Sequence, residues 1–174
     1  MGIRTLADVE AIEAVPFADR VGFTSVFDML QAVSAEQGDK IALRFLREGL
    51  PDEPSRDVTY REFGRKLRQA ANLFRAHGVG PQDSVSLLLP ISPETFIAMF
   101  GAQKAGMANP INFLLEKDHI VALLRSANCK VLVGPDPDLF PGLWAKVKAV
   151  RAEVPTLKSV FRLGGPAERP EIDA

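Results

Sequence analysis

Hydrophobic residues along this chain recur at two spacings, and each spacing predicts one kind of element. Steps of three to four residues place apolar side chains on one face of a helix, whereas alternation or a short continuous apolar run is typical of strands. Helices are predicted at 24–38, 59–78, 92–105, 116–127 and 140–153. Strands are predicted at 40–47, 57–59, 84–89, 107–109, 130–134 and 159–163.

The clearest helix start is Thr59-Tyr-Arg-Glu62, which has the spacing of a capping box. In this motif the threonine hydroxyl and the glutamate carboxylate each accept a hydrogen bond from a backbone amide at the helix start. An apolar stripe follows at helical spacing: Phe63, Leu67, Ala70, Ala71 and Phe74. We expect Gly38 and Gly78 to take the left-handed conformation that ends helices.

The continuous apolar run Leu87–Leu89 predicts a strand that is covered on both faces. Pro90 ends this strand, Ser92 suits the cap of the next helix, and Pro93 suits its first position, where a missing N–H costs nothing. Strands that alternate with helices predict an α/β fold with a mostly parallel, doubly wound sheet. The order of the strands stays open.

The chain divides into three parts. Residues 1–23 show neither period and include Pro16 and two glycines, so we expect an irregular N-terminal arm. Residues 24–163 hold the predicted helices and strands and form one α/β scaffold. Residues 164–174 form a polar tail, which we interpret as a linker or a truncation point.

Composition narrows the class of protein. With 174 residues, 47% of them hydrophobic and 25% charged, the chain resembles an ordered globular domain. A formal net charge of −1 offers no field that would attract nucleic acid. The single cysteine, Cys129, cannot close an intramolecular disulfide, and no apolar run reaches the roughly 20 residues that cross a bilayer. Residues 1–20 also lack a signal-peptide pattern, so we expect a soluble cytoplasmic protein without a transmembrane segment.

Gly101 and Gly106 have the spacing of the glycines in a Walker phosphate loop. Met107-Ala108 follow them, where that loop needs a lysine and a hydroxyl residue. We therefore interpret Gly101 and Gly106 as helix-end residues. Gly78-Val-Gly80 likewise lacks the third glycine of a dinucleotide-binding fingerprint.

The remaining candidates also favour structural roles. His77 and His119 lack cysteine or carboxylate partners at metal-ligand spacing, so we interpret both as helix-surface residues. Cys129 adjoins an apolar run and is expected to be a buried, inert thiol. Two carboxylates around a proline at Asp136-Pro-Asp138 are typical of a turn, and Trp144 has the spacing of a packing residue. We assign no catalytic, cofactor-binding or metal-binding residue.

Three segments nevertheless form a pattern through their order and spacing. They are Val58–Phe63 with Ala70–Leu73 and Gly78–Gly80, then Asp83–Val85 with Leu89-Pro90 and Glu94, and then Gly101–Gly106 with Asn109–Asn112. Together they resemble the N-terminal region of AMP-forming acyl-CoA synthetases, members of the adenylate-forming superfamily, over about residues 25–163. Departures from the family pattern occur in turns, at Gln82, Ile91, Ser92 and Phe113.

The resemblance implies an acid–thiol ligase. Such an enzyme uses ATP and Mg2+ to convert a carboxylate to an acyl-adenylate, and then uses coenzyme A to form a thioester. Prevalence in the family favours a fatty or aromatic acid and a role in fatty acid metabolism. The family's phosphate loop, adenine pocket, acyl tunnel and mobile C-terminal lysine domain do not occur in this sequence. We expect this fragment to bind none of these cofactors, to be inactive alone, and to have the remainder of its own chain as its partner.

A hypothesis from a different class is a stand-alone small α/β module that binds a ligand or a protein and has no ligase activity. The reading frame beyond Ala174 discriminates the two, because a Ser/Thr-Gly-Thr-Thr-Gly-x-x-Lys loop favours the ligase and a stop codon favours the module. A scaffold separated from its enzyme should expose an apolar patch and self-associate. Phe96 and Phe100 are candidates for that patch if the sheet does not cover them.

Overall fold

The computed structural model describes residues 2–163, and the predicted tail at 164–174 lies outside this range. The helices are α1 (Leu6–Glu13), α2 (Phe17–Arg20), α3 (Val26–Glu36), α4 (Tyr60–Ala76), α5 (Pro93–Ala105), α6 (Lys117–Ser126) and α7 (Pro141–Arg151). The strands are β1 (Ile41–Phe45), β2 (Arg56–Thr59), β3 (Ser84–Leu87), β4 (Met107–Pro110), β5 (Cys129–Gly134) and β6 (Ser159–Arg162). The helices and strands predicted from residue 24 onward are present, with small differences at their ends.

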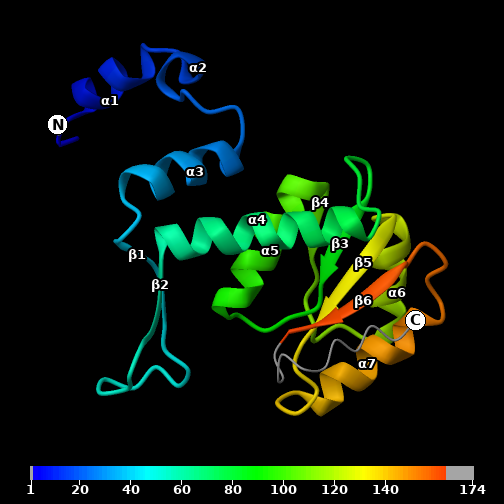
Figure 1. The fold of residues 1–174 in the computed structure, drawn as a ribbon. Coiled ribbons are helices and arrows are strands. Elements are labelled where there is room, and N and C mark those ends of the chain that lie inside the picture. The colour runs from blue at the N-terminus through cyan, green and yellow to red at the C-terminus, as the bar shows by residue number, and fades with distance from the viewer. Residues whose placement is uncertain (1, 164–174) are drawn as a thin grey trace.

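The central feature is a parallel sheet with the strand order β4-β3-β5-β6. Strands β1 and β2 form a separate antiparallel pair. Helices α4 and α5 cover one face of the parallel sheet, and α6 and α7 cover the other (Figure 1). The predicted α/β fold with a parallel, doubly wound sheet is therefore confirmed, and the structure adds the strand order. Within residues 2–163, no helix combines the length and the apolar character that crossing a membrane requires.

Strand β3 lies inside the sheet, between β4 and β5, and all of its residues are buried. Leu87 packs in the core on the α4–α5 face, while Leu88, at 0% exposure, packs in the core on the α6–α7 face. The expectation of a strand covered on both faces is confirmed. The strand ends at Leu87 instead of Leu89, although one further contact with β5 follows, in which the Leu88 N–H donates to the Val133 carbonyl at 2.9 Å.

Polar side chains connect β3 to both neighbouring strands. Across the β3–β4 pair, Asn109 Nδ2 donates a hydrogen bond to Ser86 Oγ at 3.0 Å. Directly before β3, the Asp83 carboxylate accepts a hydrogen bond from Asn128 Nδ2 at 3.1 Å and lies 3.3 Å from Lys130 Nζ. These contacts join particular residues of neighbouring strands, in contrast to the interchangeable apolar contacts of the core.

Glycines explain how closely the elements approach. Gly78 has a φ of 80° and ends α4, as predicted. The same expectation for Gly38 is wrong, because its φ is not positive and a Cβ there would lie 2.8 Å from the Ser34 carbonyl oxygen. The interpretation of Gly101 as a helix-end residue is also wrong. It lies inside α5 against α4, where a Cβ would come within 2.6 Å of the Ala70 Cβ, so only glycine permits this approach.

The N-terminal segment contains the helices α1 and α2, in place of the irregular structure expected for residues 1–23. A capping box begins α1: Thr5 Oγ1 accepts the Asp8 N–H at 3.3 Å, and the Asp8 carboxylate accepts the Thr5 N–H at 2.8 Å. No residue of α1 or α2 is buried, and Figure 1 shows both helices away from the parallel sheet. Local hydrogen bonds therefore maintain α1, and hydrophobic periodicity could not reveal it.

Candidate functional site

A hollow of about 370 Å³ opens between α4 and α5, near the carboxyl ends of β5 and β6. Its lining is largely apolar and includes Ala70, Leu73, Phe74, Ile97, Ala98, Val133, Phe161 and Leu163. In open α/β sheets, ligands bind outside the carboxyl ends of the strands, where successive connections diverge. In this sheet β3 leads through α5 to β4 on one side, and the chain then continues with β5 on the other side. The hollow lies beside this point, at β5 and β6, and is the candidate site.

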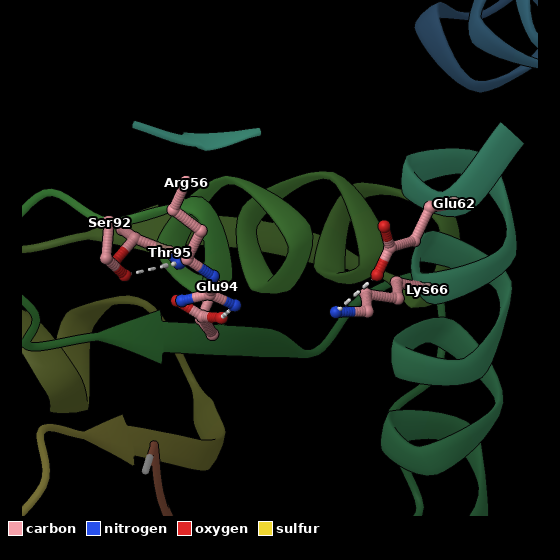
Figure 2. Close-up of polar contacts among 6 residues, drawn as sticks. All are labelled: Arg56, Glu62, Lys66, Ser92, Glu94 and Thr95. Carbon is pink, nitrogen blue, oxygen red and sulfur yellow. Dashed lines mark hydrogen bonds and ion pairs between the residues drawn. The ribbon is translucent and has the colours of Figure 1, made fainter. Parts of the chain in front are cut away.

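Two ion pairs border the hollow and are drawn in Figure 2. Lys66 Nζ lies 3.0 Å from Glu62 Oε1, one turn earlier on α4, and Arg56 of β2 pairs with Glu94 of α5. The hydrogen bond from Lys66 lowers the pKa of Glu62. Burial pushes the pKa of Glu94 upward, but the hydrogen bond from Arg56, a backbone hydrogen bond and the charges of Arg56 and Lys66 together lower it below the ordinary 4.5. Both carboxylates are charged near neutral pH, and neither is tuned for proton transfer there.

The start of α4 confirms only half of the predicted capping box. Thr59 Oγ1 accepts the Glu62 N–H at 3.2 Å, as predicted. The predicted return contact from the Glu62 carboxylate to the helix start is wrong, since that carboxylate pairs with Lys66 instead. Residues four apart on a helix are neighbours, and the opposite charge makes Lys66 the stronger partner.

The turn between β3 and α5 is fixed by hydroxyl groups. Ser92 Oγ accepts the Thr95 N–H at 3.2 Å (Figure 2). Thr95 Oγ1 donates to the Pro90 carbonyl at 2.7 Å. Pro93 occupies the beginning of the helix, so both predictions for this turn are confirmed. The turn holds Glu94 toward Arg56 and leaves Ile91 exposed.

Neither histidine reaches the hollow. His119 is exposed on α6, as predicted. His77 lies at the C-terminal cap of α4, but it is half-buried and not a simple surface residue. Its Nδ1 lies 2.7 Å from Ser159 Oγ, and its ring packs edge-on against Phe161 with centroids 4.8 Å apart. Both contacts connect the end of α4 to β6, which is a packing role.

The other candidates from the sequence also have structural surroundings. Cys129 is 0% exposed, and burial raises the pKa of its thiol, in agreement with the predicted inert cysteine. Asp136 Oδ1 accepts the Asp138 N–H at 2.9 Å, which is the predicted turn. Trp144 packs on the core of the α6–α7 face and against Gly134. Gly106 follows α5 as its C-cap, as predicted.

The described residues do not fit the phosphates of ATP or a magnesium ion. The two carboxylates that border the hollow are each paired with a basic side chain. The Walker-like pair fails as a loop, because Gly101 lies inside α5 and Gly106 at its end. Among residues 2–163, no group of three or more histidine, cysteine, aspartate or glutamate side chains is arranged to hold a metal ion. We therefore derive no catalytic step through these groups.

Sequence reasoning placed Ala70 and Phe74 on an apolar stripe but missed the hollow that they help to form. Leu73 lies outside the main apolar stripe of α4 and is 43% exposed, while Phe161 and Leu163 come from the last predicted strand. Their convergence depends on the strand order, which the sequence left open. The one available signal was Leu73 itself, an apolar residue on a polar part of the helix.

Comparison with known proteins places this architecture in a family. The model of the AMP-binding enzyme family matches residues 30–171. The chain is 30% identical over 166 residues to the marinolic acid–CoA ligase of Pseudoalteromonas sp., covering 95% of this chain and 25% of that protein. It is 33% identical over 130 residues to an acetyl-coenzyme A synthetase of Beijerinckia indica, covering 74% of this chain and 20% of the relative. The chain belongs to the AMP-binding enzyme family, and it spans about a quarter or less of these relatives.

Solved structures agree at the level of the fold. The anthranilate CoA ligase AuaEII, solved with anthranoyl-AMP, matches with a TM-score of 0.70 at 24% identity, covering 87% of this chain and 27% of that one. The N-terminal domain of FACL13 from Mycobacterium tuberculosis matches with a TM-score of 0.67 at 20% identity, covering 87% of this chain and 39% of that domain. The parallel sheet and its helices thus correspond to part of the N-terminal domain of such ligases.

Proposed function

We propose that residues 24–163 are the scaffold of the N-terminal domain of an AMP-forming acyl-CoA synthetase. The longer protein activates a carboxylate with Mg-ATP to give an acyl-adenylate and pyrophosphate, and then transfers the acyl group to the thiol of coenzyme A. The observation that carries this proposal is the family match over residues 30–171 on a sheet of the same fold. The substrate is a carboxylic acid, either fatty or aromatic, and the enzyme acts in the cytoplasm.

This part of the enzyme supplies no reacting group in our proposal. Its acidic side chains at the hollow are charged and paired, and its thiol is buried. Catalysis of adenylation requires positioned amides and cations where charge develops on phosphate oxygens. The scaffold instead fixes the turns around the carboxyl ends of the strands, through contacts such as those of Ser92 and Thr95.

A paired assay tests the proposal. The 174-residue chain and the longer protein encoded by its gene are each titrated with millimolar Mg-ATP and assayed for carboxylate-dependent release of pyrophosphate. We expect saturable ATP binding and pyrophosphate release from the longer protein only. Activity in the short chain would contradict our placement of the reacting groups, and a stop codon directly after Ala174 would contradict the ligase itself and favour a stand-alone module.

A further inference from the structure

The tip of the β1–β2 hairpin, residues 46–55, is arranged around one charged side chain. Figure 1 shows this hairpin extending away from the parallel sheet. Within residues 46–57 every residue is exposed except Glu53, which is half-buried. Leu46 and Leu50 are 41% and 55% exposed. Apolar side chains therefore lie outside and a carboxylate lies inside, which reverses the usual arrangement, so burial of apolar surface does not hold this tip together.

Four successive backbone amides converge on the Glu53 carboxylate. Its Oε1 accepts a hydrogen bond from the Arg47 N–H. Its Oε2 accepts the N–H groups of Glu48, Gly49 and Leu50 at 2.9, 2.8 and 3.3 Å. Gly49 has a φ of 72°, and a left-handed residue in such a run curves the chain so that neighbouring N–H groups point to one place. Amides grouped in this way bind anions, and the anion here is a side chain of the same loop.

The base of the hairpin is held by separate contacts. Phe45 pairs with Arg56 at the end of the antiparallel ladder. The Arg44 guanidinium donates two hydrogen bonds to the Asp57 carboxylate, at 2.9 and 2.8 Å. Neither contact involves Glu53, so the base can stay paired while the tip opens.

We propose that Glu53 is a latch, whose ionised carboxylate keeps the tip at residues 46–55 closed and whose protonation releases it. A protonated carboxyl group has lost its charge and carries a donor, so it is a poor partner for four converging N–H groups. The two states of the tip differ in these hydrogen bonds, while β1 and β2 stay as they are. The latch is independent of the proposed function, because it involves no substrate.

The surroundings of Glu53 fix the direction in which pH acts. Loss of hydration raises the pKa of Glu53, but the hydrogen bonds from the four amides outweigh it, so this pKa lies below the ordinary 4.5. A lowered folded-state pKa favours the closed tip above pH 4.5, and this preference is lost as the pH falls through the folded-state value. No basic side chain among residues 2–163 forms an ion pair with Glu53. The other charged side chains of the hairpin are exposed, and some of them pair elsewhere: Arg44, Arg47, Glu48, Asp52, Arg56 and Asp57.

Hydrogen exchange in the longer protein tests the latch with two variants of equal charge. Glu53→Gln removes the charge that the amides surround, and Glu48→Gln removes a charge from an exposed position of the same loop. Near neutral pH we expect the amides of residues 47–50 to exchange about 10-fold faster in Glu53→Gln and at the parent rate in Glu48→Gln, because exchange follows local opening. Trypsin cleavage after Arg47 should accelerate in the same variant only. In the parent, protection corrected for the intrinsic effect of pH should disappear below pH 4.5.

The outcomes either support the latch or overturn it. Equal protection of residues 47–50 in the parent and in Glu53→Gln would overturn it. Equal losses in Glu53→Gln and Glu48→Gln would assign the effect to the net charge of the loop and would also overturn it. A loss of protection in Glu53→Gln that extends through 41–45 and 56–59 would show that the whole hairpin opens, against a latch at the tip. Faster exchange confined to the tip, with an unchanged melting temperature, supports the latch.

Discussion

Helices α1 and α4 begin in the same way but contribute to the protein differently. Each starts with a threonine, Thr5 or Thr59, whose hydroxyl accepts the N–H of the third helical residue. Helix α4 then buries five residues, among them Leu67 at 0% exposure, whereas α1 buries none. A cap thus starts a helix, but burial decides whether that helix belongs to the cooperative core.

The largest effect is expected from a charge placed in the core. Leu88→Asp puts an unpaired carboxylate at a position that is 0% exposed and should cost at least about 3–5 kcal/mol, enough to prevent soluble folding. Leu6→Asp in α1 is the control, because Leu6 is 72% exposed and should leave the urea midpoint unchanged. Equal solubility and melting temperature for Leu88→Asp and the parent would show that the central strand is wrongly assigned.

A smaller loss is expected where α4 and α5 touch. In Gly101→Ala the new Cβ lies 2.6 Å from the Ala70 Cβ, and overpacking should cost about 1–3 kcal/mol despite the better helix propensity of alanine. The added change Ala70→Gly should restore part of the loss. Gly22→Ala is the matched control near α2, since a Cβ at Gly22 meets nothing within 4 Å. Thermal unfolding measures all three, and a neutral Gly101→Ala would contradict the close helix contact.

The caps themselves provide the sharpest comparison. Thr59→Ala should lower the global free energy of unfolding by about 1 kcal/mol, because α4 unfolds together with the core. Thr5→Ala removes the same kind of hydrogen bond, but it should only increase hydrogen exchange in residues 6–13 and leave the global transition in place. A global effect of Thr5→Ala would mean that α1 is part of the core after all.

The smallest expected effect is that of acid, to which the core at Asp83 and helix α1 at Asp8 should respond differently. The backbone amide of Gly80 is the main cause that lowers the pKa of Asp83, and the amide of Arg4 is the main cause for Asp8, both from an ordinary value of 3.8. A lowered folded-state pKa stabilises the fold above pH 3.8 and loses this effect as the pH falls through the folded-state value.

Chemical unfolding at several pH values tests this difference. The gap in urea midpoint between the parent and Asp83→Asn should be constant near neutral pH and should close below pH 3.8. Asp8→Asn should produce no gap in the midpoint and should change only the exchange of amides in α1. A midpoint gap for Asp83→Asn that persists at the lowest pH would exclude its carboxylate as the cause.

Periodicity and caps predicted the elements of the core because burial and helix starts leave local marks in the sequence. The apolar run at Leu87–Leu89 and the caps at Thr59 and Ser92 are such marks. Helix α1 was missed although Thr5 and Asp8 have the Thr-x-x-acid spacing that was used at Thr59. Because α1 has no buried face, this spacing was the only sign of the helix in the sequence. A helix was predicted only where an apolar stripe was also present.

The hollow could not be predicted, for a different reason. Lys66 and Leu163 both line it although they are far apart in the sequence, so their proximity follows from the strand order. The patch considered at Phe96 and Phe100 is half-buried, and Phe100 packs edge-on against Phe63 with ring centroids 6.0 Å apart. Which apolar residues stay exposed is thus a property of the assembled helices. Self-association of the short chain remains a proposal, with the hollow as its surface.

The two leucines that end the β3 segment pack in different cores, Leu87 on the α4–α5 face and Leu88 on the α6–α7 face. Sliding β3 by one residue would exchange them, and it would also place Ser84 and Ser86 where Val85 and Leu87 pack. Ser86 can meet Asn109 and Asp83 can meet Asn128 in the native alignment alone. The order of serine, valine and leucine along β3 and a few polar atoms at its neighbours therefore select the same alignment, so the register of this sheet is specified twice.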